Sequence, residues 1–188
     1  MILPVYSYGN KILNQPTEEI DPGHEGLAEL IENMWETMYA CNGVGLAAPQ
    51  VGHGIAVLVM DAGMLDDQFE GVKRVMINPD LTELSDNKVS YEEGCLSIPN
   101  IREEIKRPEK IKVGYEDENF EFHEETFDSI PARIIQHEID HLDGILFTDR
   151  ISRLRKRLIS KKLDQIAKGY ARADYPMEFP SKKRKTAG

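Results

Sequence analysis

Long hydrophobic runs, cysteines and a basic leader are all scarce in this chain of 188 residues. No apolar stretch approaches the ~20 residues needed to cross a bilayer, so we expect no membrane span. The opening residues, MILPVYSYGNKI, lack the features of a signal peptide and are poor in the Arg and Ser of a transit peptide. The chain has two cysteines, Cys41 and Cys95. Without an export signal, free thiols or a metal role are expected rather than a disulfide, and the protein is expected in the cytoplasm.

Charge is distributed unevenly along the chain. Hydrophobic residues make up 40% and charged residues 30%, an ordinary mix for one globular domain. Residues 1–149 carry 10 Lys/Arg and 30 Asp/Glu, whereas residues 150–188 carry 13 Lys/Arg and 3 Asp/Glu. The basic end is either a solvated face with a soluble tail or a contact for ribosomal RNA, which would attract basic side chains.

The spacing of apolar residues predicts an α+β fold in one domain over 1–170, followed by a basic, disordered tail over 171–188. Helices are expected at 23–40, from about 130 to Gly144, and from Ser152 to Gly169. Strands are expected at 55–60, 72–79, 88–99, 110–116 and 120–127, with a tight loop at 43–52 and a Gly-centred turn near Gly94. These strands lack regular intervening helices, which favours mostly antiparallel sheets packed around the central helix.

The last predicted helix has an apolar stripe opposite a basic face. Its stripe would consist of Ile151, Leu154, Leu158, Ile159, Leu163 and Ile166. Its basic face would consist of Arg153, Arg155, Arg157, Lys161 and Lys162.

The central helix carries an HExxH pattern within QHEIDHLDG, residues 136–144. His137 and His141 are four residues apart, so on a helix they share one face and can bind one metal ion, with Glu138 beside them as a proton carrier. A catalytic site usually has a third protein ligand. The metzincin proteases carry that ligand as a third His, but Phe147 stands at its position and no His follows His141. The only later Glu is Glu178, in the predicted tail.

Cys95, in the segment EGCLS, is the best candidate for the third ligand. Gly94 before it lets the backbone turn closely, and a thiolate binds zinc or ferrous iron well. The residues alone leave a second interpretation open, in which Cys95 is a small buried hydrophobe, as we expect for Cys41. The remaining histidines are expected at the surface: His24, His53 and His123.

Three segments occur together: GVGLAAPQ (43–50), EGCLSIP (93–99) and QHEIDHLDG (136–144). Their order, spacing and content closely resemble the bacterial-type peptide deformylase family, over most of residues 1–165. The resemblance implies hydrolysis of the formyl group from the N-terminal formyl-methionine of new polypeptides, with release of formate. It implies Cys95, His137 and His141 as metal ligands. Ferrous iron is the usual metal, and zinc, nickel or cobalt can replace it.

The resemblance also implies roles for the surrounding residues. Glu138 would take a proton from water and deliver it to the departing amine, while the Gln50 amide and the Leu96 backbone N–H would stabilise the negative oxygen. Gly43 and Gly45 would let the backbone crowd the metal and exclude larger acyl groups. The substrate-binding positions would be Gly43, Val44, Tyr91, Glu93, Gly94, Ile130, Arg133 and Ile134. Arg133 is expected to line the methionine pocket with its stem and to hold its head in solvent.

Two other functions are compatible with parts of the pattern. One is a zinc endopeptidase, which the lack of a downstream third ligand disfavours; the other is an inactive binding module with a structural metal. The expected partners are formyl-methionyl nascent peptides and, through the basic end, the ribosome. We expect a monomer.

Overall fold

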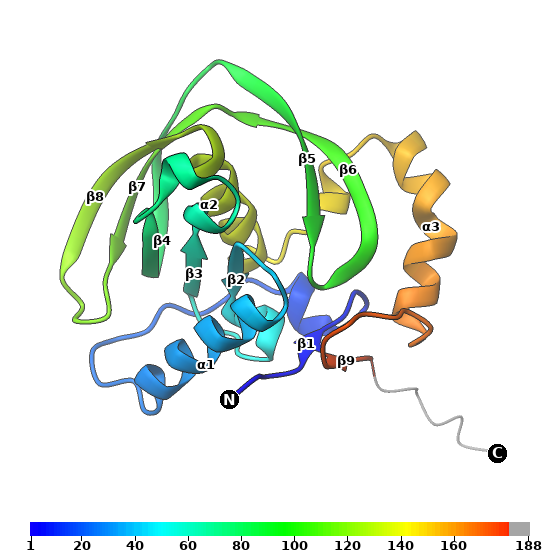
Figure 1. The fold of residues 1–188 in the computed structure, drawn as a ribbon, viewed down its shortest axis with the longest axis horizontal. Coiled ribbons are helices and arrows are strands. Elements are labelled where there is room, and N and C mark those ends of the chain that lie inside the picture. Colours follow the sequence, from blue (N-terminus) through cyan, green and yellow to red (C-terminus); the bar gives the residue numbers. More distant parts are fainter. Residues whose placement is uncertain (181–188) are drawn as a thin grey trace.

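The computed structural model describes residues 1–180, which form three α-helices and nine β-strands (Figure 1). The helices are α1 (Leu27–Ala40), α2 (Ser129–Leu142) and α3 (Arg153–Ala167). The strands are β1 (Val5–Tyr6), β2 (Gly45–Ala47), β3 (Val57–Asp61), β4 (Lys73–Leu84), β5 (Lys88–Cys95), β6 (Ile98–Pro108), β7 (Lys110–Glu116), β8 (Phe122–Asp128) and β9 (Met177–Glu178). Short 3₁₀ helices are η1 (Lys11–Asn14), η2 (Ala48–Val51), η3 (Ala62–Met64), η4 (Asp67–Phe69) and η5 (Phe147–Asp149).

The strands form one large sheet and two small ones. The large sheet has the order β2-β3-β4-β7-β8, and all its neighbouring strands are antiparallel. Strands β5 and β6 form a long antiparallel hairpin, and β1 pairs with β9 in parallel. The predicted α+β class with mostly antiparallel sheets is therefore confirmed.

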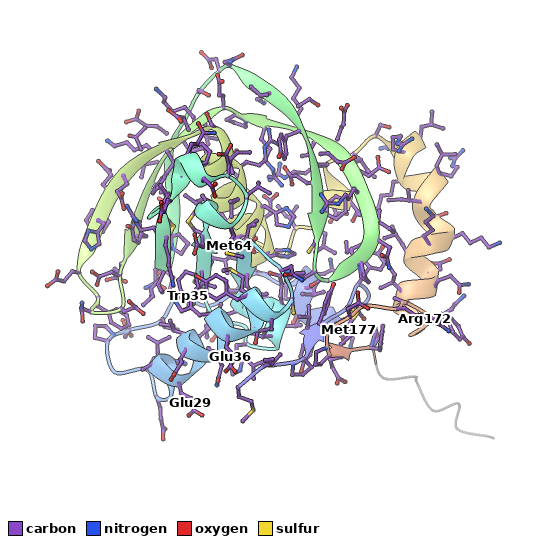
Figure 2. All side chains as sticks on the ribbon, viewed as in Figure 1. Glu29, Trp35, Glu36, Met64, Arg172 and Met177 are labelled. Carbon is purple, nitrogen blue, oxygen red and sulfur yellow. The ribbon has the colours of Figure 1, made fainter. Side chains whose placement is uncertain are left out.

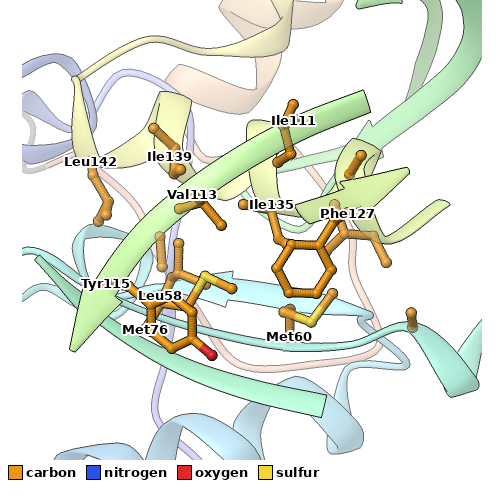
Figure 3. Close-up of a cluster of buried hydrophobic side chains, with 14 of the residues drawn as sticks. Leu58, Met60, Met76, Ile111, Val113, Tyr115, Phe127, Ile135, Ile139 and Leu142 are labelled. Carbon is orange, nitrogen blue, oxygen red and sulfur yellow. The ribbon is translucent and has the colours of Figure 1, made fainter. Parts of the chain in front are cut away.

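The large sheet is covered by a helix on each face. Strand β3 has no polar face: Val57 and Val59 pack on the α1 side, while Leu58 and Met60 pack on the α2 side. Figure 3 shows the α2 side, where Ile135, Ile139 and Leu142 meet residues of β3, β4, β7 and β8. Because side chains alternate along a strand, burial on both faces produces the continuous apolar run seen in the sequence.

Helix α2 is enclosed on a second side by the β5–β6 hairpin, which arches over it in Figure 1. Every residue of α2 from Pro131 to Leu142 is buried, including the charged and polar ones. Buried polar groups need partners, and the hairpin supplies them: Glu93 of β5 bonds His137, and Arg107 of β6 bonds Asp140. The HExxH helix is thus the centre of the molecule.

Helix α1 begins later than the sequence predicted. It starts at Leu27 after Gly26, which has φ +76°, whereas the prediction began it at residue 23. Its apolar stripe is buried as expected, at Leu27, Leu30, Ile31, Met34 and Met38. Figure 2 shows Glu29 and Glu36 on the outer side of α1, and Trp35 packs toward the sheet.

The ends of helix α3 agree with the prediction, but the burial of its apolar stripe does not. The Ser152 side chain caps it by accepting a hydrogen bond from Arg155 N. Ile159, Leu163 and Ile166 are buried against β6, but Leu154 and Leu158 are exposed, so only part of the predicted apolar stripe packs on the core. The buried part of this helix therefore lies in its C-terminal half.

Three further segments differ from the predictions. Strand β6 was not predicted, and the turn lies at Leu96–Ser97, while Gly94 is inside β5. The predicted loop at 43–52 contains β2 and η2. The predicted disordered tail began at residue 171, but β9 at 177–178 pairs with β1. The rest of that tail, residues 181–188, lies outside the described residues. None of the described helices has the length and apolarity that crossing a bilayer requires.

We predict that Gly144→Ala destabilises the fold more than Gly169→Ala. Both glycines follow a helix at positive φ, +72° and +80°, where an Ala costs about 1–2 kcal/mol. A Cβ at residue 144 would also lie 2.7 Å from Gln15 N, whereas at residue 169 the nearest atom is Phe179 Cγ at 3.6 Å. Urea unfolding should give a loss for Gly144→Ala that exceeds the control by about 1 kcal/mol or more. Equal losses would show that the close approach to Gln15 carries no cost.

Candidate metal centre and its surroundings

Cys95, His137 and His141 come together at the centre of the molecule. Their ligand atoms all lie within 4.8 Å of one another, and Cys95 Sγ is 3.2 Å from His141 Nε2. The two histidines lie on successive turns of α2. Cys95 is the last residue of β5, and the hairpin brings it over the helix. This group of one thiol and two imidazoles is the donor set expected for zinc or ferrous iron.

The alternative ligands considered from the sequence are not part of this group. Glu178 lies in β9 and its backbone oxygen accepts from Ser7 N, away from the histidines of α2. Phe147 instead stacks on the His137 ring, with ring centroids 6.3 Å apart. Burial raises the pKa of the Cys41 thiol, which matches its interpretation as a small apolar residue.

His137 is oriented by a buried carboxylate. Its Nδ1 lies 2.9 Å from Glu93 Oε2 and donates to it, which leaves Nε2 as the nitrogen that can bind a metal. Glu93 also accepts two bonds from Arg107, at 2.7 and 2.9 Å, and one from Arg133 at 2.9 Å. Burial raises the pKa of Glu93, but the hydrogen bonds from Arg107 and His137 outweigh it and hold that pKa well below its usual range. Glu93 is therefore a fixed negative charge behind the ligand.

The two histidines differ in their pKa. Burial lowers the pKa of His137, but hydrogen bonds to Cys95 and Glu93 raise it above its usual value. Burial, then the charge of His137, lowers the pKa of His141 well below its usual value, so this ring is neutral. The surroundings thus favour one positive charge at His137, which a proton or a metal ion can supply, and leave His141 in its ligating form.

Gln50 and the Leu96–Ser97 turn line the side of the centre nearest Cys95. Gln50 is buried in η2, and its Oε1 accepts from Ala47 N at 2.9 Å, which fixes the amide. Its Nε2 lies 3.4 Å from both Cys95 Sγ and Ser97 Oγ. Among residues 1–180 the Leu96 N–H has no hydrogen-bond acceptor. Two donors are therefore present beside the cysteine.

Glu138 is a buried carboxylate with an unpaired oxygen. Its Oε2 has no hydrogen-bond partner among the described residues. Burial raises the pKa of Glu138 to about 7, against the opposing charge of His137. A Cβ at Gly45 would lie 2.8 Å from Glu138 Cδ and 2.9 Å from its Cγ, so only a glycine leaves room for this side chain. Gly43 is similarly tight, with Leu96 Cδ1 only 3.0 Å from an added Cβ.

The predicted substrate-binding residues fall into two groups. Val44 and Ile130 are half-buried and pack on the cluster that contains Ile134, and Tyr91 of β5 is exposed. Val44, Ile130 and Ile134 thus belong to one apolar cluster, and Tyr91 lies on the hairpin strand β5. Gly94 instead packs against the Arg102 side chain, 3.3 Å from an added Cβ, within the hairpin.

The expected placement of the Arg133 head in solvent was wrong. The Arg133 head is buried, and it donates to Glu93 Oε1 at 2.9 Å, Ile105 O at 2.8 Å and Val89 O at 2.6 Å. It therefore ties α2 to the hairpin and does not reach solvent. The Glu93 carboxylate is occupied by Arg107, Arg133 and His137, so it supports the ligand His137, and its role in binding substrate stays a prediction.

Sequence reasoning missed Arg107 and Asp140. Arg107 joins the two carboxylates, donating to Glu93 and, at 2.6 Å, to Asp140 Oδ2, while Arg150 also bonds Asp140. Asp140 lies inside the HExxH segment, and a charged residue on the buried side of a central helix was the available signal. Arg107 lies in the unpredicted strand β6 and gave no such signal.

Comparisons with known proteins agree with this geometry. The family model of polypeptide deformylase matches residues 2–157. A peptide deformylase of Christiangramia forsetii is 44% identical over 194 residues, covering 98% of this chain and 99% of the relative. One of Flavobacterium psychrophilum is 43% identical and covers 98% and 100%.

Solved structures give the same result. Peptide deformylase 1B of Arabidopsis thaliana has a TM-score of 0.82 at 36% identity, covering 89% of this chain and 92% of that one. Peptide deformylase of Thermotoga maritima has a TM-score of 0.75 at 41% identity, covering 81% and 99%. The chain therefore belongs to the polypeptide deformylase family, whose metal-dependent enzymes remove N-formyl groups from nascent polypeptides.

Proposed function

We propose that this chain hydrolyses formyl-methionyl peptides at a metal held by Cys95, His137 and His141, with Glu138 as the proton-transfer group. The observation that carries this proposal is a buried, unpaired carboxylate next to a cluster of one thiol and two imidazoles. When bound, a divalent metal supplies Lewis-acid chemistry that makes water a usable nucleophile near neutral pH. The remaining chemistry belongs to the protein.

Glu138 is suited to move one proton in both directions. A group with a pKa of about 7 can accept a proton from the attacking water and return it to the departing amine at the same pH. Gly45 behind the carboxylate keeps it close to the ligands, because any larger residue would push it away. The product pair is formate and a free amino terminus.

The negative charge that develops on the formyl oxygen needs donors. We propose the Gln50 side-chain amide and the Leu96 N–H for this role. Gln50 is held by its own bond to Ala47 N, and the Leu96 N–H has no acceptor within residues 1–180. Donors fixed in advance cost little reorganisation during the reaction, and each is typically worth ~10²–10³ in rate.

The methionine side chain is proposed to lie against Val44, Tyr91, Ile130 and Ile134. Ile130 and Ile134 are one turn apart on α2, on the face that continues to His137. An apolar wall beside the metal centre favours an unbranched apolar side chain such as methionine. Gly43 packs closely against Leu96, and we propose that this close packing beside the centre excludes acyl groups larger than formyl.

Ferrous iron is proposed as the working metal, one ion per chain. Thiolate and imidazole donors suit both iron and zinc, and the order of divalent affinities favours zinc. Zinc, nickel or cobalt is therefore expected in protein prepared where those metals are supplied.

We further propose that the enzyme works as a monomer in the bacterial cytoplasm. The donor set of one thiol and two imidazoles is complete within one chain, and the formylated substrates are made in that compartment.

A contact with the ribosome through α3 is also proposed. Arg155 is paired with Glu103 and Lys156 with Asp149, whereas Arg157, Lys161 and Lys162 are exposed without an ion-pair partner among residues 1–180. These three form the basic surface of α3. Basic side chains on an otherwise acidic protein favour approach to RNA, where the nascent peptide emerges.

Glu138→Ala should abolish most deformylase activity while metal content stays at the wild-type level. Loss of a general acid–base group typically costs ~10²–10⁴ in rate. The measurement is anaerobic release of formate from formyl-Met-Ala-Ser by protein loaded with ferrous iron, or with zinc for comparison. Iron-loaded protein should be faster.

The matched control is Asp143→Ala, which removes an exposed carboxylate just after α2 and should retain full turnover. Turnover by Glu138→Ala close to that of the control would contradict the role of Glu138. Cleavage of internal peptide bonds without release of formate would support the endopeptidase alternative instead.

Cys95→Ala should lower the metal content well below one ion per chain, because it removes one of three ligands. Cys41→Ala is the control, since Cys41 is buried at the end of α1 outside the cluster. Metal is measured by elemental analysis after dialysis of both variants. Equal metal content in the two variants would remove Cys95 from the ligand set.

Reversing the charge of the basic surface of α3 should weaken binding to ribosomes. The variant combines Arg157→Glu, Lys161→Glu and Lys162→Glu, and co-sedimentation at low salt is the measurement. A control with the same net charge combines Lys11→Glu, Lys88→Glu and Lys106→Glu, all exposed and outside α3. If both variants bind alike, the surface of α3 is not the contact.

A further inference from the structure

The Leu96–Ser97 turn is held from outside by two elements. The Ser97 carbonyl accepts from Tyr8 N at 2.8 Å, next to β1. The Leu96 carbonyl accepts from the Tyr175 hydroxyl, also at 2.8 Å. Strands β5 and β6 are joined here by only two residues, so these two external bonds are what fixes the carbonyls of the turn.

Tyr175 belongs to the C-terminal segment, residues 170–180, which is anchored on both sides of it. Before Tyr175, the Asn100 side chain donates to Arg172 O at 3.0 Å. After it, β9 pairs with β1, and the Asn10 side chain donates to Glu178 O at 2.9 Å. Figure 2 places Arg172 and Met177 along this segment below α3 and beside β1.

Tyr175 is a hydroxyl donor in a protected position. Burial, together with the nearby Cys95 and Cys41, raises the pKa of Tyr175 well above its usual value, so the hydroxyl keeps its proton. The side chain lies beyond residue 157, where the match to the family model ends. The bond to Leu96 is thus made by a part of the chain outside that match.

We propose that Tyr175 is a positioning residue, whose hydroxyl holds the Leu96–Ser97 peptide so that the Leu96 N–H and Cys95 keep a fixed orientation. The bond fixes the rotation about the Leu96 Cα–C bond, next to the N–H that the proposed function uses as an oxyanion donor. Without it, the Leu96 carbonyl has no fixed donor, and the turn is held only at Ser97, through the Tyr8 N–H and the Gln50 side chain, so the Leu96–Ser97 peptide can rotate. The inference rests on the proposed function, in which the Leu96 N–H acts in the transition state.

The test compares Tyr175→Phe with Tyr170→Phe in the full-length, metal-loaded enzyme. The first variant removes only the hydroxyl; the second removes a hydroxyl from an exposed tyrosine of the same segment. For Tyr175→Phe we expect kcat to fall about tenfold with KM within about twofold, as for an interaction made only in the transition state. Tyr170→Phe should match the wild type.

A second measurement is independent of activity. Hydrogen–deuterium exchange of the peptide that covers residues 93–99 should be faster in Tyr175→Phe, by roughly fivefold to tenfold, and unchanged in Tyr170→Phe. Faster exchange with unchanged kcat would overturn the proposal, since the bond would then be only structural. A lower kcat with unchanged exchange would also overturn it. Absence of formate release by the wild type would instead contradict the proposed function, while the exchange measurement would still test the bond.

Discussion

The Glu93 carboxylate is the group on which the centre of this molecule depends. A carboxylate buried without partners would cost several kcal/mol, so its position between β5 and α2 is stable only if donors converge on it. Arg107 reaches it from β6, and Arg133 and His137 reach it from α2. The same contact that fastens the hairpin to the helix therefore also fixes the ring of a metal ligand. Packing and ligand orientation are consequences of one buried charge.

Two buried carboxylates of this centre have opposite environments. Glu93 is saturated with donors and remains ionised, while Glu138, the neighbour of His137, has an oxygen without a partner and a pKa of about 7. Environment rather than residue type thus separates a fixed charge from a group that can exchange a proton. Gly45 contributes to this difference between the two carboxylates. It leaves space for the Glu138 side chain and has no side chain that could donate a hydrogen bond to it. The Gly-rich segment is in this way part of the proton-transfer site.

The sequence predicted the α+β class, the ends of α2 and the grouping of Cys95 with the HExxH histidines. It did not predict β6, and the reason is physical. The buried positions of that strand carry Glu103 and Arg107 as well as Ile101 and Ile105, so charge interrupts the apolar alternation by which a strand is recognised. Arg133 was misjudged for the same cause, since its partners lie on the unrecognised hairpin. Strand β9 has two residues, too few for any periodicity.

The basic C-terminal region contributes apolar contacts to the core as well as positive charge. Ile159, Leu163 and Ile166 of α3 share a cluster with Leu13 and Phe147, and Phe147 stacks on His137. A chain that ended near residue 150 would expose this cluster and would also lose the bond from Tyr175 to the Leu96 carbonyl. Loss of ribosome binding by such a truncation would then follow from disturbance of the centre itself. Only changes of exposed charge, which leave these apolar contacts in place, separate docking from folding and catalysis.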